Sequence, residues 1–190
     1  MSTLITPVEL AQWQSDGESL FIFDCRSSLM DEAAGKRAYD DAHIPGAQFA
    51  HLSDDLSGPI TTGVTGRHPL PEKDAFVTTL EKWGVTNHSR IVAYDDANGA
   101  FAARLWWMMR WVGHANVTVL EGGLMAWKAA DFTTDAAIPQ PVSSQFTPTS
   151  SISKTIDADD LLNSGHFIID ARDQERFDGK VEPIDPIAGH

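Results

Sequence analysis

The segment Leu20-Phe-Ile-Phe-Asp-Cys-Arg26 is repeated later in the chain as Phe167-Ile-Ile-Asp-Ala-Arg172. The aspartates of the two copies, Asp24 and Asp170, are 146 positions apart, and the two arginines are separated by the same 146 positions. A repeat of this length has the size of a whole domain. The sequence therefore predicts a duplicated domain in which each copy contains the same short strand, followed by Asp, a small residue and Arg.

The second copy is expected to be incomplete within the 190 residues. The first copy continues with Ala42-His-Ile-Pro-Gly-Ala47, and the sequence ends at Ala188-Gly-His190, where the same motif would begin again. Between the copies, Thr, Ser, Pro and Gln dominate a stretch without periodicity, which is typical of a linker. We therefore expect a full domain at 1–130, an interdomain linker at 131–154 and the start of a second domain at 155–190.

The composition restricts the classes of partner. The chain has 14 Lys and Arg against 27 Asp and Glu, which gives a formal net charge of −13. This balance argues against nucleic acid and anionic membrane surfaces, because both attract basic patches. A small anionic substrate requires a local cluster of Arg or backbone N–H groups that overrides the overall field. The single Cys excludes an internal disulfide, and neither a signal peptide nor a membrane span is evident, so we expect a cytoplasmic protein.

Short apolar runs alternate with helical patterns along the first copy. Strands are expected at 20–23, near 46–49, at 90–94 and at 117–120, and helices from Pro7, at 71–83, at 100–112 and at 123–127, with a long loop at 53–70. The second copy is expected to contain a helix at 158–163 and a strand at 167–169. Alternating strands and helices predict an α/β fold with a mainly parallel sheet flanked by helices.

Four segments together resemble the rhodanese-type sulfurtransferases. They are Asp24-Cys-Arg26, His43-Ile-Pro-Gly-Ala47, Val92-Ala-Tyr-Asp95 and Leu120-Glu-Gly-Gly-Leu-Met-Ala-Trp127. The resemblance covers essentially the whole chain, and the pattern is most similar to the two-domain thiosulfate and 3-mercaptopyruvate sulfurtransferases. It implies a rhodanese-like fold, a catalytically silent N-terminal copy and a C-terminal copy that carries the reactive Cys.

Asp95 stands where this resemblance places the nucleophile. The family passes sulfur through a cysteine persulfide, which needs a thiolate held on a loop whose backbone N–H groups point inward, ahead of a helix N-terminus. A carboxylate cannot carry a persulfide, and its charge would repel an anionic donor. We therefore expect the first copy to be silent, and the repeat offset places the nucleophile 146 residues after Asp95, beyond His190.

Cys25 is the alternative candidate because it is the one thiol in the chain. It follows the first strand and not the strand at 90–94, and its counterpart in the second copy is Ala171. The duplicated architecture does not require sulfur at this position. We expect Cys25 to be an incidental small residue and not the sulfur carrier.

Structural roles are expected for five polar residues. Arg26 and Arg172 each follow an aspartate, Asp24 or Asp170, at the end of a strand, and Arg is suited to two-point contacts with a carboxylate. We expect each pair to fix its loop. His43 belongs to the His-Ile-Pro-Gly-Ala turn and is expected to be a structural hydrogen-bonding residue.

The resemblance implies substrate-binding roles for Arg176 and His68. Arg176 corresponds to the arginine that contacts the anionic donor, but the second arginine of mercaptopyruvate-type enzymes is absent, because Glu182-Pro-Ile184 has Ile in that place. This departure favours thiosulfate as donor without establishing it. His68 matches a loop histidine that assists proton transfer with an aspartate, and the matching position is Ser53, next to Asp54. A solvated Arg176 and an ordinary loop His68 are the alternatives.

Two functions remain open at this stage. The first is a portion of a sulfurtransferase that moves sulfur from thiosulfate or 3-mercaptopyruvate to cyanide or a thiol acceptor, with a thioredoxin-like reductant as a further partner. The second is a catalytically inactive rhodanese-like binding or regulatory module, which Asp95 supports. No cofactor is expected, and no metal is expected because the seven His show no close metal-ligand spacing. A phosphatase of related loop architecture would need Cys and Arg at 95–101, which are missing.

Overall fold

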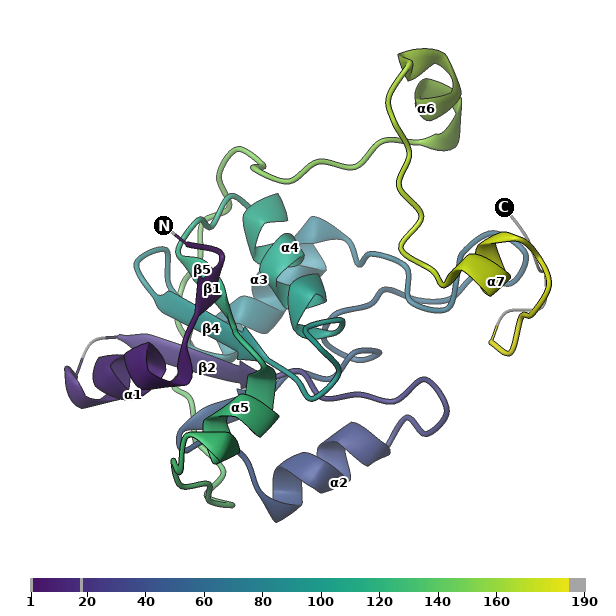
Figure 1. Cartoon of the computed structure of the whole chain (residues 1–190). Coiled ribbons are helices and arrows are strands. Elements are labelled where there is room, and N and C mark those ends of the chain that lie inside the picture. The colour runs from purple at the N-terminus through teal and green to yellow at the C-terminus, as the bar shows by residue number, and fades with distance from the viewer. Residues whose placement is uncertain (1, 18, 185–190) are drawn as a thin grey trace. The chain divides into compact units, whose positions relative to one another are not determined.

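Five parallel strands form a single sheet in the computed structural model, which describes residues 2–17 and 19–184 (Figure 1). The sheet order is β1-β5-β4-β2-β3. The strands are β1 (Leu4–Ile5), β2 (Leu20–Asp24), β3 (Ala47–Phe49), β4 (Arg90–Tyr94) and β5 (Val117–Leu120). The predicted α/β fold with a mainly parallel sheet is confirmed. The sequence missed β1, which has only two residues and no pattern of its own.

Helices cover both faces of this sheet. Those of the first unit are α1 (Pro7–Ser15), α2 (Ala34–Asp41), α3 (Lys73–Lys82), α4 (Ala102–Trp111) and α5 (Gly123–Ala129). The buried residues of α3 and α4 pack on one face and those of α1 and α5 on the other. α1 begins with the predicted capping box of Thr6 and Glu9. α2 was not predicted, because its sequence is mostly polar and Tyr39 is its one large buried side chain.

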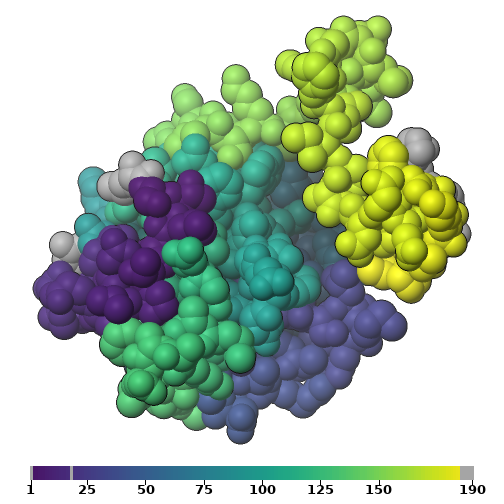
Figure 2. All heavy atoms as spheres, in the orientation of Figure 1, coloured from purple at the N-terminus to yellow at the C-terminus, as the bar shows by residue number. Residues whose placement is uncertain are grey.

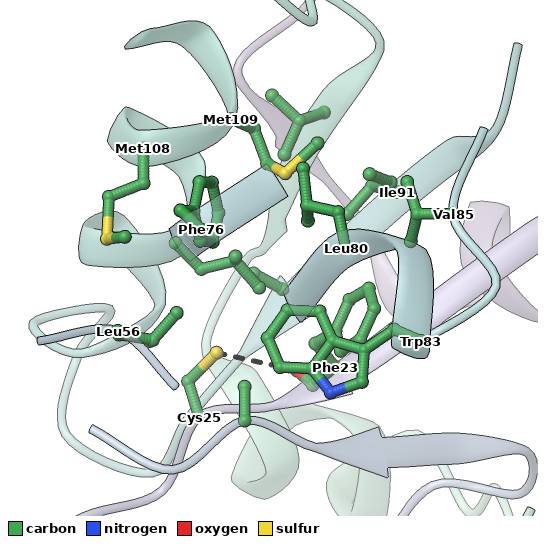
Figure 3. Packing of buried hydrophobic residues seen from close by; sticks show 14 of the residues in the cluster. Phe23, Cys25, Leu56, Phe76, Leu80, Trp83, Val85, Ile91, Met108 and Met109 are labelled. Carbon is green, nitrogen blue, oxygen red and sulfur yellow. Dashed lines mark hydrogen bonds between the residues drawn. The ribbon is translucent and has the colours of Figure 1, made fainter. Parts of the chain in front are cut away.

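The strands alternate between the two apolar clusters. Ile22 and Val92 belong to the cluster of α1 and α5, whereas Phe23 and Ile91 belong to the cluster of α3 and α4. Figure 3 shows the second cluster, in which strand residues meet Phe76 and Leu80 of α3 and Met108 and Met109 of α4. Burial on both faces explains why the strands appear in the sequence as continuous apolar runs.

Residues 131–154, the return segment, contain no helix or named strand but belong to the first compact unit, which extends to Lys154. Phe146 is 4% exposed and lies in the cluster of α3 and α4. The Asn87 amide exchanges two hydrogen bonds with the Thr147 backbone, at 2.7 and 2.9 Å. In Figure 2 the light-green end of the segment lies on the teal atoms around α4, where the Ile152 N–H donates to the Arg110 carbonyl over 2.8 Å. The expected linker is thus attached along the first unit.

The second unit begins at Thr155 and contains α6 (Ala158–Ser164) and α7 (Gln174–Phe177). The predicted helix at 158–163 is confirmed, and the Asp157 side chain caps it. The predicted strand at 167–169 is wrong. Phe167 is 103% and Ile169 90% exposed, and no described residue of this unit supplies a neighbouring strand. A strand needs such a partner for its backbone hydrogen bonds, so apolar β-branched composition alone does not produce one.

Replacement of Phe146 tests whether the return segment stabilises the first unit. Phe146→Ala should lower the free energy of unfolding by about 3 kcal/mol, because it leaves a cavity in the core. Val142→Ala is the matched control in the same segment, since Val142 is 85% exposed, and should change it by less than about 0.5 kcal/mol. Urea unfolding measures both, and equal small effects would show that the segment is not docked.

Candidate functional site

The loops that follow β2, β3 and β4 meet at one edge of the sheet. Asp24 ends β2 and Tyr94 ends β4, and the two residues are paired in register. In open parallel sheets, ligand sites form at the carboxyl ends of the strands because the loops converge there. This edge also contains Asp95 and Arg26, so three of the site candidates from the first copy, Asp24, Arg26 and Asp95, lie at one edge of the sheet.

A buried hydrogen-bond network joins Asp24, Arg26 and Tyr94. The Asp24 carboxylate accepts from Arg26 Nε at 3.0 and 2.9 Å and from Nη2 at 2.6 Å, and the Tyr94 hydroxyl donates to it over 2.7 Å. Arg26 Nη2 also donates to the Ala42 carbonyl over 2.7 Å, and the Ile44 N–H donates to the Tyr94 oxygen over 3.2 Å. The network therefore ties β2, β4 and the turn before β3 together.

Burial and the charge of Asp24 together shift the pKa values of Arg26 and Tyr94. Burial opposes the charge of Arg26, but hydrogen bonding to Asp24 and the Asp24 charge outweigh it and raise the pKa of Arg26. Burial, followed by the charge of Asp24, raises the pKa of the Tyr94 phenol. Arg26 and Tyr94 therefore act as a fixed cation and a fixed donor around the carboxylate.

Asp95 lies at the start of the loop between β4 and α4 and is 1% exposed. One carboxylate oxygen accepts the N–H groups of Ala97 at 2.9 Å and Gly99 at 2.8 Å. The other accepts those of Phe101 and Ala102, both at 2.8 Å. Four backbone donors at a helix N-terminus form a cradle for an anion, and the carboxylate of the chain itself occupies it.

The backbone of Asp95 is enclosed by the start of α5. The Leu124 N–H donates to the Asp95 carbonyl over 3.0 Å. A Cβ at Gly123 would lie 2.1 Å from that carbonyl oxygen, and the φ of Gly123 is +55°. Only glycine fits this position. The Gly122-Gly123 pair of the sequence motif therefore serves the close approach of α5 to the Asp95 loop.

Cys25 is placed in the core and not on this loop. Its side chain lies among apolar residues that include Leu56 (Figure 3), and its Sγ is 3.8 Å from the Phe23 carbonyl oxygen. Burial raises the pKa of the Cys25 thiol well above its usual value, and the charges of Asp24 and Asp95 raise it further. The thiol therefore stays protonated, whereas a sulfur nucleophile must be a thiolate.

His43 is fully buried, and both of its ring nitrogens lie close to backbone carbonyl oxygens. Its ring stacks on Tyr39 with 4.0 Å between centroids, and Nδ1 lies 2.7 Å from the Tyr39 carbonyl oxygen. Nε2 lies 3.2 Å from the Ala137 carbonyl oxygen, and the backbone of His43 pairs with Asp135. His43 thus attaches the return segment to the turn before β3, and its structural role stays a prediction.

His68 and Ser53 line the same pocket of about 350 Å³. Burial lowers the pKa of His68, and the charges of Arg67 and Arg104 lower it further. Asp54, the neighbour considered in the sequence, instead lies 3.3 Å from His51 Nδ1. The structure therefore brings Ser53, and not an aspartate of that loop, to the pocket of His68.

The second unit repeats the Asp-Arg geometry of the first. Arg172 Nε donates to Asp170 at 3.0 and 2.9 Å and Nη2 at 2.6 Å, the same distances as in the first copy. Hydrogen bonding to Arg172 lowers the pKa of Asp170 to about 2. Unlike its counterpart, this pair is partly exposed, with side-chain exposures of 27% and 25%.

Arg176 forms a two-point ion pair with Glu182, and this pair was not predicted from the sequence. Arg176 Nε lies 3.1 Å from Glu182 Oε2, and Nη2 lies 3.0 Å from each oxygen. Glu182 Oε1 also accepts the Ile184 N–H over 3.0 Å. The pair spans an irregular loop, so no periodic pattern in the sequence could have revealed it.

Within residues 2–17 and 19–184, no group of three or more His, Cys, Asp or Glu side chains could hold a metal ion. In the same residues, no helix is both long and apolar enough to cross a membrane.

Comparison with known proteins identifies related chains. Residues 6–130 match the family model described as "Rhodanese-like domain". A Pseudomonas aeruginosa protein named "Probable 3-mercaptopyruvate sulfurtransferase" is 46% identical over 193 residues, covering 98% of this chain and 67% of its own length. SseB of Mycobacterium tuberculosis, provisionally named a thiosulfate sulfurtransferase, is 38% identical over 192 residues with the same coverage.

A solved structure is similar over the whole chain. The 3-mercaptopyruvate sulfurtransferase from Leishmania major matches with a TM-score of 0.81 at 29% identity, covering 100% of this chain and 52% of that protein. The chain thus spans about two thirds of the length of the two curated relatives and about half of the Leishmania protein.

Removal of the Asp95 carboxylate should strongly destabilise the first unit. Asp95→Ala leaves four backbone donors without their acceptor, at about 1–3 kcal/mol for each donor that stays buried and unpaired, so we expect a loss of at least about 3 kcal/mol. Asp96→Ala removes the same charge from the exposed neighbouring residue and should cost less than about 0.5 kcal/mol. Chemical denaturation compares them, and similar losses would refute the role of the carboxylate.

The two Asp-Arg pairs allow a comparison of burial at constant geometry. Arg26→Gln leaves the fully buried Asp24 carboxylate without its cation and should cost about 3–5 kcal/mol. Arg172→Gln removes the matching cation from a partly exposed pair and should have a much smaller effect. Urea unfolding of both variants measures this difference, and equal effects would contradict it.

Proposed function

This chain belongs to the rhodanese-like domain family, and on that premise we propose that it is the non-catalytic first unit and the beginning of the catalytic second unit of a two-domain sulfurtransferase. The enzyme moves sulfane sulfur from thiosulfate or 3-mercaptopyruvate to cyanide or to a thiol acceptor. The names of the relatives support sulfur transfer as the activity.

We assign different roles to the two units mainly because the Asp95 carboxylate occupies the anion cradle of the first unit. A sulfur carrier on this loop would need a thiolate where the four N–H groups converge, and the Asp95 carboxylate already accepts all four. The buried, protonated Cys25 is no substitute. We therefore assign the sulfur carrier to a cysteine on the corresponding loop of the second unit, outside residues 1–190.

The proposed reaction has two displacement steps. The cysteine thiolate attacks the outer sulfur of thiosulfate, the S–S bond breaks, and sulfite leaves with the bonding electrons. Cyanide carbon then attacks the outer sulfur of the persulfide, which releases thiocyanate and restores the thiolate. A thiol acceptor replaces cyanide by the same attack, and we propose that a thioredoxin-like protein in the cytoplasm serves as reductant.

Arg176 is the proposed contact for the anionic donor. Its guanidinium is oriented by the two-point pair with Glu182, whose side chain is 5% exposed. A guanidinium has five N–H donors, so it can bind a donor oxygen alongside the Glu182 carboxylate. Ile184 stands where the resemblance to mercaptopyruvate-type enzymes places a second arginine, and this departure favours thiosulfate as the donor.

An inactive binding or regulatory module is the second candidate function. The Asp95 loop supports this function as well. The carboxylate of the chain itself satisfies the four N–H groups of the loop, so the unit needs no bound substrate for stability. The two functions differ in whether a complete second unit confers turnover. Activity therefore decides between them.

Thiocyanate formation in the presence of cyanide tests the proposal. The enzyme with a complete second unit should turn over thiosulfate or 3-mercaptopyruvate, whereas residues 1–190 alone should not. Cys25→Ala, which copies Ala171 of the second unit, should keep turnover within about twofold, because the change is small and the Cys25 thiol takes no part in the proposed chemistry. Turnover by residues 1–190, or cyanide-releasable sulfur on Cys25, would overturn the assignment.

A comparison of the two donors tests the role of Arg176 in the complete enzyme. Arg176→Ala should raise KM for both donors roughly tenfold or more, because it removes a charge-assisted contact to an anion. Lys180→Ala removes a cation from the same segment, where Lys180 pairs with the partly exposed Asp178, and should leave KM unchanged. A similar KM in both variants would exclude Arg176 as donor contact.

A further inference from the structure

The His43 ring is surrounded by more hydrogen-bond acceptors than a neutral imidazole can satisfy. Its Nδ1 lies 2.7 Å from the Tyr39 carbonyl oxygen. Its Nε2 lies 3.2 Å from the Ala137 carbonyl oxygen and 3.4 Å from the Asp135 carboxylate. A neutral imidazole has one N–H donor and one lone pair, whereas an imidazolium has two donors. Both ring nitrogens of His43 therefore face oxygen atoms that can only accept.

Either neutral tautomer would place a nitrogen lone pair against an oxygen. With hydrogen on Nδ1, the Nε2 lone pair would face the Ala137 carbonyl and the Asp135 carboxylate. With hydrogen on Nε2, the Nδ1 lone pair would face the Tyr39 carbonyl over 2.7 Å. Because the His43 side chain is fully buried, such an unmade hydrogen bond is costly. A second ring proton removes the conflict, since each nitrogen then donates to an oxygen.

Burial of a charge is also costly, and three features of the surroundings oppose this cost at His43. The Tyr39 carbonyl belongs to the last turn of α2, where the helix dipole is negative. The Tyr39 ring stacks on the imidazole with 4.0 Å between centroids, and the face of an aromatic ring attracts a cation. The Asp135 carboxylate is within ion-pair distance. The site is therefore suited to an imidazolium.

The other groups around His43 leave Asp135 as the charge that matters at the ring. The charged and titratable groups of the surrounding elements are Lys36, Tyr39 and Asp40 of α2, Asp24 and Arg26 at the end of β2, Tyr94 of β4 and Asp135 of the return segment. Asp24 pairs with Arg26, and Asp40 pairs with Lys36, so each pair is neutral in sum. Burial raises the pKa of both phenols, to about 12 for Tyr39, so both are uncharged near neutral pH.

We propose that His43 is a proton-dependent latch, an imidazolium that holds the start of the return segment against the turn before β3. The backbones of His43 and Asp135 exchange two hydrogen bonds, at 2.8 and 3.0 Å. The ring extends this bridge to the Ala137 carbonyl and the Asp135 carboxylate. Loss of one ring proton turns an attraction into a repulsion at this bridge. The latch lies within the first unit and is independent of the sulfur-transfer function proposed above.

The latch should weaken as the pH rises. A histidine in an unfolded chain is mostly neutral above about pH 6.5, so a ring that is charged in the folded chain takes up a proton on folding. Its contribution to stability is complete below that pH and is lost as the pH rises and the folded ring gives up its proton. The bridge between His43 and Asp135 should therefore open in alkaline solution.

Nitrogen NMR of the imidazole rings in the chain of residues 1–190 tests the charge directly. At pH 7 both ring nitrogens of His43 should carry a hydrogen. The signals are assigned through contacts with the stacked Tyr39 ring, so the assignment requires no variant that might fail to fold. A single protonated nitrogen at pH 7 would overturn the proposal.

Hydrogen exchange in the same chain measures the bridge itself. The Asp135 amide, which donates to the His43 carbonyl, should lose protection at least about tenfold between pH 7 and pH 9, relative to the Thr149 amide. Thr149 is the control because its N–H donates to the Val112 carbonyl from the same return segment. The ratio of the two rates also cancels the ordinary increase of exchange with pH. A constant ratio would exclude a proton-dependent latch.

Two aspartate substitutions separate the charge at the ring from the charge of the segment. Asp135→Asn keeps the shape of the side chain but removes the negative charge, so the bridge should open about one pH unit lower. Asp131→Asn is the matched control, because Asp131 is an exposed aspartate of the same segment and Asn tolerates its φ of +60°. It should leave the pH of opening unchanged. Equal shifts in both variants, or no shift in Asp135→Asn, would overturn the proposal.

Discussion

The four hydrogen bonds that converge on the Asp95 carboxylate set the geometry of the functional edge of the sheet. They satisfy the backbone donors of the loop after β4 and define where α4 begins. The Asp95 carbonyl in turn accepts from α5, which approaches closely because Gly123 has no side chain. Two helices and one strand end thus depend on a single residue. Since its carboxylate occupies the whole cradle, the contacts that stabilise the first unit leave none of these four donors free for another anion.

The two copies of the Asp-x-Arg segment distinguish what the local sequence determines, which is the geometry of the ion pair, from what the tertiary structure determines, which is its burial. The Arg26–Asp24 and Arg172–Asp170 pairs have the same three side-chain distances. Three consecutive residues are therefore sufficient for the geometry. Burial differs, because only in the first unit do Tyr94 and the turn before β3 enclose the carboxylate. The free energy of the pair is consequently a property of the surroundings, which the repeat in the sequence does not encode.

The sequence predicted those parts of the structure that depend on interactions between residues close together in the chain. Strands such as 90–94 are continuous apolar runs, and the capping box at Thr6 is a local signal. The strand at 167–169 was predicted from the same kind of run, and it failed because pairing depends on a neighbour. The position of Asp95 was predicted from the order of motifs. Its four donors and the partner of Glu182 were not, because these contacts join irregular segments that follow no period.

One loop at this edge of the sheet carries His68, whose surroundings include the positive charges of Arg67 and Arg104. The chain as a whole has a net charge of −13, so its overall field is negative. Burial lowers the pKa of His68, and the positive charges of Arg67 and Arg104 lower it further, against this overall field. A histidine that is neutral near physiological pH can accept a proton. Arg104 also donates to the Leu56 and Pro69 carbonyls at the two ends of this loop, so it both holds the loop ends together and favours the neutral form of the histidine on it.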